Sequence, residues 1–118
     1  MDGRRELPRW KINKTFKVSF ENIGTLPDCL VEDLNLKGMC LSASEKLPQN
    51  RTVRMGLELT EDNYVEVDIQ IPWVRESQGR FFHGLAFTRM MDEDKDKIYH
   101  YINNHCSKQL KDQWWQNT

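Results

Sequence analysis

Residues 64–73 read Tyr-Val-Glu-Val-Asp-Ile-Gln-Ile-Pro-Trp, and apolar and polar side chains alternate along most of this segment. Residues two positions apart lie on the same face of a β-strand. One face of the predicted strand carries the apolar side chains, Val65, Val67, Ile69, Ile71 and Trp73, and the other carries Glu66, Asp68 and Gln70. The segment therefore predicts a half-buried strand that lies against a core.

Five further segments have strand character, and turn residues separate them. The predicted strands are Thr15–Phe20, Cys29–Leu36, Met39–Ala43, Val53–Leu59 and Phe81–Thr88. The separating segments are Asn22–Asp28, Lys37-Gly38, Leu47–Asn50, Glu61–Asn63 and Glu76–Gly79. Short strands with turns at nearly regular spacing predict a mainly β fold, either a small barrel or a sandwich.

The two ends of the chain differ from this middle part. Residues 1–11 are predicted to form a basic arm, with Pro8 discouraging helix. Asp92 is predicted to cap a helix over residues 92–113, because acidic residues follow it and apolar residues then recur at helical spacing. The apolar face comprises Ile98, Tyr101, Ile102, His105 and Leu110. The 118 residues are thus expected to form one domain, with the strands within 15–88.

The charge distribution narrows the classes of ligand. Residues 1–17 carry six basic and two acidic side chains, a net charge of +4, within a chain of net charge −1. A basic arm on a weakly acidic body favours a compact anion over a nucleic acid polymer, which needs a broad basic face. Glu58, Glu66 and Asp68 would make the outer strand faces acidic, which also disfavours binding of single-stranded nucleic acid.

The cysteines and histidines show no spacing typical of a disulfide framework, a metal site or a nucleophile. Cys29, Cys40 and Cys106 are odd in number and follow no apolar signal segment, which predicts a reducing cytoplasm. No run approaches the roughly 18 apolar residues of a membrane span. With no acid/base pair or phosphate-binding glycine loop visible, the protein is expected to be no enzyme and to carry no cofactor.

Two segments together predict a nucleotide site. Arg5 and Arg9 lie at i and i+4 in the arm, and Asp33-Leu34-Asn35-Leu36-Lys37-Gly38 follows later. Period-2 alternation would place Leu34 and Leu36 inward and leave the side chains of residues 33 and 35 outward, about 6 to 7 Å apart. Guanidinium groups bind phosphate, while carboxylate and amide oxygens accept from guanine N–H groups, so an anionic purine is the expected ligand. Gly38 would allow a tight turn.

These segments resemble the two signatures of the PilZ domain family, bacterial receptors for cyclic di-GMP. Arg5 to Arg9 matches its Arg-x-x-x-Arg segment, and Asp33 to Gly38 matches its Asp/Asn-x-Ser-x-x-Gly segment, with Asn35 in place of the serine. Residues 82–87, Phe-His-Gly-Leu-Ala-Phe, are similar to a third family strand. The resemblance implies a six-stranded antiparallel β-barrel with a C-terminal helix, and cyclic di-GMP as ligand. The implied ligand-binding residues are Arg4, Arg5, Arg9, Asp33, Asn35, Gly38, Trp73 and Arg75.

Some assignments stay open at this point. Trp73 ends an apolar face and is either a core residue, which is the commoner case, or a stacking surface for a purine. Trp114-Trp115 either packs on the barrel or marks a partner surface. The expected function is a receptor whose arm is mobile until the nucleotide fixes it, changing the surface offered to a downstream protein. The alternative is a PilZ-like adaptor that contacts a protein partner without binding the nucleotide.

Overall fold

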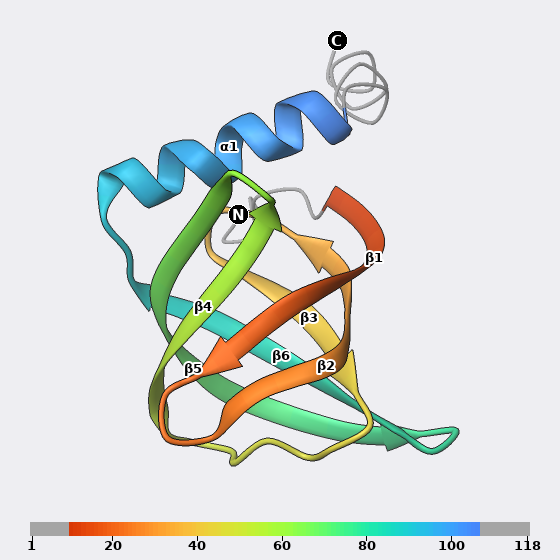
Figure 1. Ribbon diagram of the computed structural model, residues 1–118. Helices are drawn as coiled ribbons and strands as arrows, with labels where there is room; N and C mark the ends of the chain where they lie inside the picture. Colours follow the sequence, from red (N-terminus) through yellow and green to blue (C-terminus); the bar gives the residue numbers. More distant parts are fainter. Residues whose placement is uncertain (1–9, 107–118) are drawn as a thin grey trace, which may run out of the picture.

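A computed structural model describes residues 10–106, apart from the side chains of Pro27 and Asp28. Six strands close into an antiparallel barrel in the order β1-β2-β3-β6-β5-β4 (Figure 1). The strands are β1 (Trp10–Phe20), β2 (Gly24–Leu34), β3 (Gly38–Ala43), β4 (Thr52–Thr60), β5 (Asn63–Ser77) and β6 (Arg80–Arg89). The expected six-stranded barrel with a C-terminal helix is confirmed.

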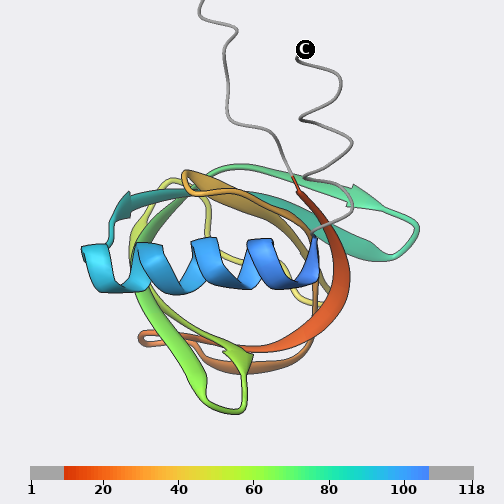
Figure 2. The same cartoon turned by 90° about the horizontal axis from the view of Figure 1, so that it is seen from above.

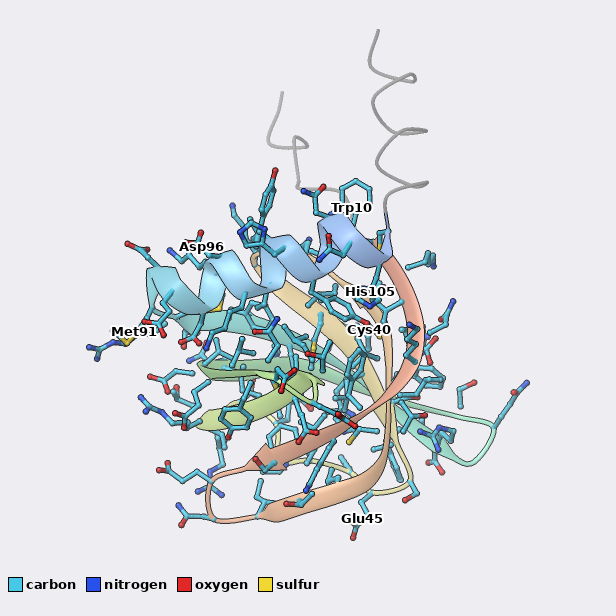
Figure 3. The ribbon with its side chains drawn as sticks, turned by 45° about the horizontal axis from the view of Figure 1, so that its top comes forward. Trp10, Cys40, Glu45, Met91, Asp96 and His105 are labelled. Carbon is cyan, nitrogen blue, oxygen red and sulfur yellow. The ribbon has the colours of Figure 1, made fainter. Side chains whose placement is uncertain are left out.

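The helix α1 (Asp92–His105) lies across one mouth of the barrel (Figure 2). Its buried residues are Ile98, Tyr101 and Ile102. The ring of Tyr101 meets that of Phe16 edge to face, with centroids 5.8 Å apart, so the helix is joined to the core of β1. The β3–β4 loop, with Glu45, lies at the end of the barrel away from α1 (Figure 3). Within residues 10–106, no helix has the length and apolar character needed to cross a membrane.

Alternation along β5 builds much of the core, as the sequence predicts. Val65, Val67, Ile69 and Ile71 are all at most 2% exposed. Trp73, however, is 40% exposed, so its expected place in this inward row is wrong. The register explains the difference, because β5 advances three residues from Gln70 to Trp73 while β6 moves two, from Ala86 to Gly84. This bulge falls at Pro72, which cannot donate to a ladder, and it turns the indole outward.

Similar irregularities extend the first two strands beyond their predicted starts. β1 begins at Trp10, five residues before the expected Thr15, so the last two residues of the predicted arm belong to the barrel. Its register shifts between Lys11 and Lys14, where Asn13 has φ of 50°, and this breaks the alternation. β2 begins at Gly24, within an expected turn, and its register shifts around Pro27. Because bulges interrupt the alternation of apolar and polar residues, the pattern did not predict these extensions of β1 and β2.

The ends of α1 also differ from the prediction. The N-cap is Met91 rather than Asp92, and it makes no side-chain capping bond. Asp92, Glu93 and Asp94 occupy the first turn, where carboxylates favour the helix dipole, as expected. The helix ends at His105, and the N–H of Cys106 donates to the carbonyl of Ile102 at 2.8 Å. The predicted continuation to 113, with Leu110, lies outside the described residues.

Candidate functional site

A row of paired residues crosses the outer wall of the barrel. Lys11 on β1 pairs with Asp33 on β2, and Asp33 pairs with Cys40 on β3. Cys40 pairs with Gly84 on β6, and Gly84 pairs with Trp73 on β5. Directly paired residues point to the same side of a sheet. The inner positions beside this row, Leu34, Met39, His83 and Leu85, are buried, so the row itself faces outward.

The middle of this wall is built from small residues. The next row places Gly38 on β3 opposite Ala86 on β6. Together with Cys40 and Gly84 these residues form what we call the floor. Three strand spacings separate β2 from β5, so Asp33 and Trp73 stand at most about 15 Å apart across it. Cys40 is one of the labelled side chains in Figure 3. The floor carries only small side chains, with a carboxylate at one side and an indole at the other.

The indole of Trp73 lies on the floor instead of projecting into solvent. A Cβ added at Gly84 would overlap the five-membered ring of the indole, so glycine is the residue that lets the ring approach the backbone. The side chain keeps 40% of its surface exposed. One face of the ring therefore packs on β6, and the other is available to a flat ligand.

A similar pair exists on the adjacent part of the barrel. Tyr64, also on β5, is 47% exposed and covers Gly56 on β4, where an added Cβ would overlap its hydroxyl. An aromatic ring therefore covers a glycine at both Gly84 and Gly56. What distinguishes Trp73 is its neighbourhood, because Asp33 and the floor residues lie in line with it.

Asn35 does not lie outward beside Asp33, which corrects the expected exposed pair. The residue is 9% exposed, and its Oδ1 accepts hydrogen bonds from the backbone N–H groups of Lys37 and Gly38 at 2.7 and 2.9 Å. Its own N–H donates to the carbonyl of Gly38 at 2.9 Å. Asparagine side chains commonly close turns in this way. Asn35 therefore shapes the β2–β3 turn, while Asp33, which is partly exposed, holds the outward position.

Gly38 is required by packing rather than by an unusual backbone angle. A Cβ there would overlap the carbonyl oxygen of Leu85 on β6. The N–H of Phe87 also donates to the carbonyl of Lys37 at 2.8 Å, which ties the turn to β6. The turn is thus fixed from inside by Asn35 and from the side by β6. The sequence predicted a glycine with a permissive backbone angle for a tight turn, and this reason is wrong, because the close approach of β3 to β6 is what requires the glycine.

Arg75 lies two residues beyond Trp73 on the same side of β5. Its guanidinium carbon is 5.8 Å from the ring centroid of Phe82, the residue that pairs with it on β6. This contact is within the range of a cation–π interaction and leaves Arg75 exposed. The positive charge therefore stands at the edge of the Trp73 side of the wall, where sequence reasoning expected a further phosphate contact.

The neighbouring Arg80 uses its guanidinium in hydrogen bonds within the protein. Its Nη2 donates to the carbonyl of Ser42 at 2.9 Å and to the Ser42 hydroxyl at 3.2 Å. That hydroxyl in turn donates to the Glu32 carboxylate at 3.3 Å. These bonds join β2, β3 and β6 beside the floor. Arg80 therefore stiffens the wall, whereas Arg75 is the more accessible cation.

Several predicted site residues cannot be placed. Arg4, Arg5 and Arg9 lie outside the described residues, as do Trp114 and Trp115. The chain nevertheless enters the barrel close to Asp33, because Trp10 pairs with Leu34. Sequence reasoning missed Lys11 and Cys40 as neighbours of Asp33. Only the strand register brings them together, and no spacing in the sequence signals it.

The sequence of this domain matches the family model described as the PilZ domain, over residues 3–104. The chain belongs to the PilZ domain family. PilZ domains are a family of cyclic di-GMP receptor domains. The match includes the segment around Asp33, the whole barrel and most of α1. The comparison of this PilZ domain with curated proteins found no match.

Two solved structures show the same fold. The Bacillus subtilis inhibitor of motility MotI/DgrA superposes with a TM-score of 0.68 at 11% identity, covering 94% of this chain and 53% of that one. MrkH of K. pneumonia in its apo state gives a TM-score of 0.70 at 17% identity, covering 92% and 55%. This PilZ domain therefore spans about half the length of either protein. At such low identity the likeness concerns the fold alone.

Proposed function

We propose that this PilZ domain is a cytoplasmic, non-catalytic receptor that binds cyclic di-GMP on the wall formed by β2, β3, β6 and β5. The observation that carries the proposal is the row in which Asp33, Cys40, Gly84 and Trp73 pair in sequence across four strands. It combines a carboxylate, a floor of small residues and an exposed indole on one surface. Membership of a cyclic di-GMP receptor family supports the same ligand.

Each feature of the wall suits one part of the ligand. The Asp33 carboxylate is an acceptor for the N–H groups on the edge of a guanine base. The free face of the Trp73 indole offers a stacking surface, which contributes about 1 to 3 kcal/mol for a stacked base. Arg75, together with Arg4, Arg5 and Arg9 of the arm, supplies the cations for two phosphates. The ligand would thus lie flat across the floor.

Asn35 and Gly38 act on the ligand through the turn. Asn35 uses its oxygen to hold two backbone N–H groups, and a serine hydroxyl can accept similar bonds. We therefore expect Asn35 to keep the turn closed and Asp33 correctly placed. Gly38 contributes by letting β3 approach β6. In this view the replacement of the family's serine preserves binding.

The arm would convert binding into a signal. Its arginines would bridge the phosphates while Asp33 holds a base, which would fix the arm against the wall near the start of β1. The surface offered to a downstream protein partner would change as a result. Limited proteolysis tests this step, because saturating cyclic di-GMP should slow cleavage around residues 4–9. Equal cleavage rates with and without the ligand would contradict the switch.

Calorimetric titration with cyclic di-GMP tests the receptor function itself. The titration uses about 0.15 M salt, which screens unspecific attraction to the basic arm, and cyclic GMP and GTP as controls. Saturable heat confined to the cyclic dinucleotide is the expected result. Absence of heat, with an unchanged melting temperature, would favour the alternative of a PilZ adaptor that does not bind the nucleotide.

Replacing either arginine of the Arg-x-x-x-Arg segment should weaken this binding. Arg5→Ala or Arg9→Ala removes a charge-assisted contact of about 1.5 to 3 kcal/mol, so the affinity should fall about tenfold or more. Lys14→Ala, an exposed cation on β1, is the control and should change the affinity little. Equal losses in all three variants would indicate unspecific attraction to positive charge.

Two matched variants test the contribution of the wall. Trp73→Ala removes the indole beside the floor, and Tyr64→Ala removes the comparable ring over Gly56. We expect Trp73→Ala to weaken cyclic di-GMP binding about fivefold or more through lost stacking, and Tyr64→Ala to leave it unchanged. A loss of binding with Tyr64→Ala and none with Trp73→Ala would place the ligand around Gly56 on β4 instead.

A further inference from the structure

A hollow separate from the proposed nucleotide wall lies where the β2–β3 turn, the end of β6 and the start of α1 meet. Its volume is about 420 Å³. The lining residues are Leu36, Lys37, Phe87, Thr88, Arg89, Met90 and Lys95, which we call the basic hollow. Met91, labelled in Figure 3, follows directly after this lining and is 71% exposed. None of Asp33, Cys40, Gly84 and Trp73 lines the hollow.

Positive charge dominates the rim of the basic hollow. Its charged lining residues are Lys37, Arg89 and Lys95, and no carboxylate is among the lining. Lys37 and Arg89 are exposed. Lys95 is paired with Asp92 at 3.7 Å, but this carboxylate is 97% exposed, so the contact is a weak surface pair. The three cations come from three different elements and converge on one space.

Asp68, the strand carboxylate that pairs with Arg89, is already engaged elsewhere. Asp68 pairs with Arg89 across β5 and β6, yet its Oδ1 is 3.1 Å from Nε of Arg54 on β4. Arg54 therefore draws Asp68 toward the opposite side of β5. The rim of the hollow keeps an excess of positive charge, which favours an anionic occupant.

The base of the basic hollow is apolar. Leu36, Phe87 and Met90 are partly buried and pack against the barrel core. Their remaining surface lines the hollow. An apolar base within a ring of cations suits a ligand that carries negative charge and an apolar group close together. A bare phosphate would satisfy the cations and leave the apolar surface unused.

From this arrangement we infer that the basic hollow docks an acidic segment of a partner protein, with an apolar side chain on its base and flanking carboxylates on the rim. Methionine adapts its shape to apolar ligands, which suits Met90 to this role. The inference goes beyond nucleotide binding and does not require it. The hollow nevertheless borders the turn that Asn35 and Gly38 shape, so the two surfaces are neighbours.

Amide NMR with short peptides tests the inference on the whole chain without nucleotide. The probe is Ac-Glu-Leu-Phe-Glu-NH2, and the controls are Ac-Lys-Leu-Phe-Lys-NH2 and Ac-Glu-Gly-Gly-Glu-NH2. We expect saturable shifts of the amides of residues 36, 37, 87–90 and 95 with the first peptide only. Shifts of equal size with the basic peptide, or shifts that avoid these residues, would overturn the inference.

Charge reversals at exposed positions give an independent check. Lys37→Glu and Lys95→Glu should each weaken the binding of the acidic peptide about tenfold or more, because repulsion replaces attraction. Lys17→Glu, an exposed position on β1 across the barrel, should change it less than twofold. The dispersion of each spectrum establishes that the variants fold. Equal effects of all three reversals would show that only net charge matters and would overturn the docking site.

Discussion

Asn35 shows how one residue can preserve a family motif while changing its chemistry. In this PilZ domain its Oδ1 accepts from the N–H groups of Lys37 and Gly38, and the residue is almost buried. A serine at this position would offer a hydroxyl to the same turn. The shared property is a short side chain with an acceptor, which asparagine retains. We therefore expect the position to tolerate the exchange.

Removing the acceptor of Asn35 should destabilise the fold. Asn35→Ala leaves the two turn N–H groups without this partner, so the free energy of unfolding should fall by about 1 to 3 kcal/mol. Asn35→Ser should lose less, because the hydroxyl can replace one bond, and its cyclic di-GMP binding should be kept or tightened. Urea denaturation of the three proteins measures the first effect. Equal stability of Asn35→Ala and the original protein would contradict the role of the Asn35 side chain in closing the turn.

His83 is a buried residue that joins three parts of the barrel. Its side chain is fully buried, Nδ1 lies 3.2 Å from the carbonyl oxygen of Leu41, and Nε2 accepts from the N–H of Leu47 at 3.0 Å. Since Nε2 accepts, the proton of the neutral ring is on Nδ1. Burial lowers the pKa of His83, and the hydrogen bond to Leu41 opposes this only in part.

The lowered pKa of His83 predicts a loss of stability in mild acid. As the pH falls below about 6.5, the unfolded chain binds a proton at this residue before the folded protein does. The free energy of unfolding should then decrease by up to about 1.4 kcal/mol per pH unit until the folded pKa is reached. The imidazole should titrate below about 6.5 by NMR. A His83 pKa above about 6.5 would contradict this prediction.

At the scale of elements, bulges decide where the pattern and the structure differ. Alternation predicted the inward face of β5 correctly from Val65 to Ile71. It failed at Trp73, because the bulge at Pro72 reverses the facing of the residues that follow. It also failed at the start of β1, where Asn13 has positive φ. Pro72 is a sequence signal for the bulge in β5, but an asparagine such as Asn13 is too common to predict a bulge.

The helix α1 contributes to stability through one face only. Ile98 is 0% exposed, whereas its neighbour Tyr99 is 52% exposed. Ile98→Ala should lower the free energy of unfolding by about 2 to 5 kcal/mol, since it opens a cavity beneath the helix. Tyr99→Ala should change it by no more than about 0.5 kcal/mol. Thermal and urea denaturation compare the pair, and similar losses would contradict the placement of α1 across the barrel mouth.

For the whole molecule, the strands and their order on the chain follow from the sequence, but the site does not. Asp33 and Trp73 are 40 positions apart along the chain. Only the order β2-β3-β6-β5 and its register bring them into line with Cys40 and Gly84. The sequence motifs therefore singled out Asp33 and Trp73 but not their neighbours Lys11 and Cys40. Long-range strand pairing carries information that no local pattern contains.

The barrel also separates two kinds of surface. The wall with Asp33 and Trp73 suits a flat ligand, while the basic hollow with Lys37 and Lys95 suits an acidic peptide. The turn at residues 35–38 contributes Leu36 and Lys37 to the hollow and Gly38 to the wall, and it is bonded to β6 through Phe87. Such an arrangement would let a receptor present a ligand and a partner on adjoining faces.

The position of cyclic di-GMP on the barrel tests these ideas most directly, and amide NMR can locate it. On titration, the largest shifts should fall on the amides of Asp33, Cys40 and Gly84 and on the indole N–H of Trp73. The amides of Ser19 and Gly56, on the wall of β1 and β4, should shift little. Shifts concentrated on that wall, or no shifts at saturating ligand, would contradict the proposed receptor site.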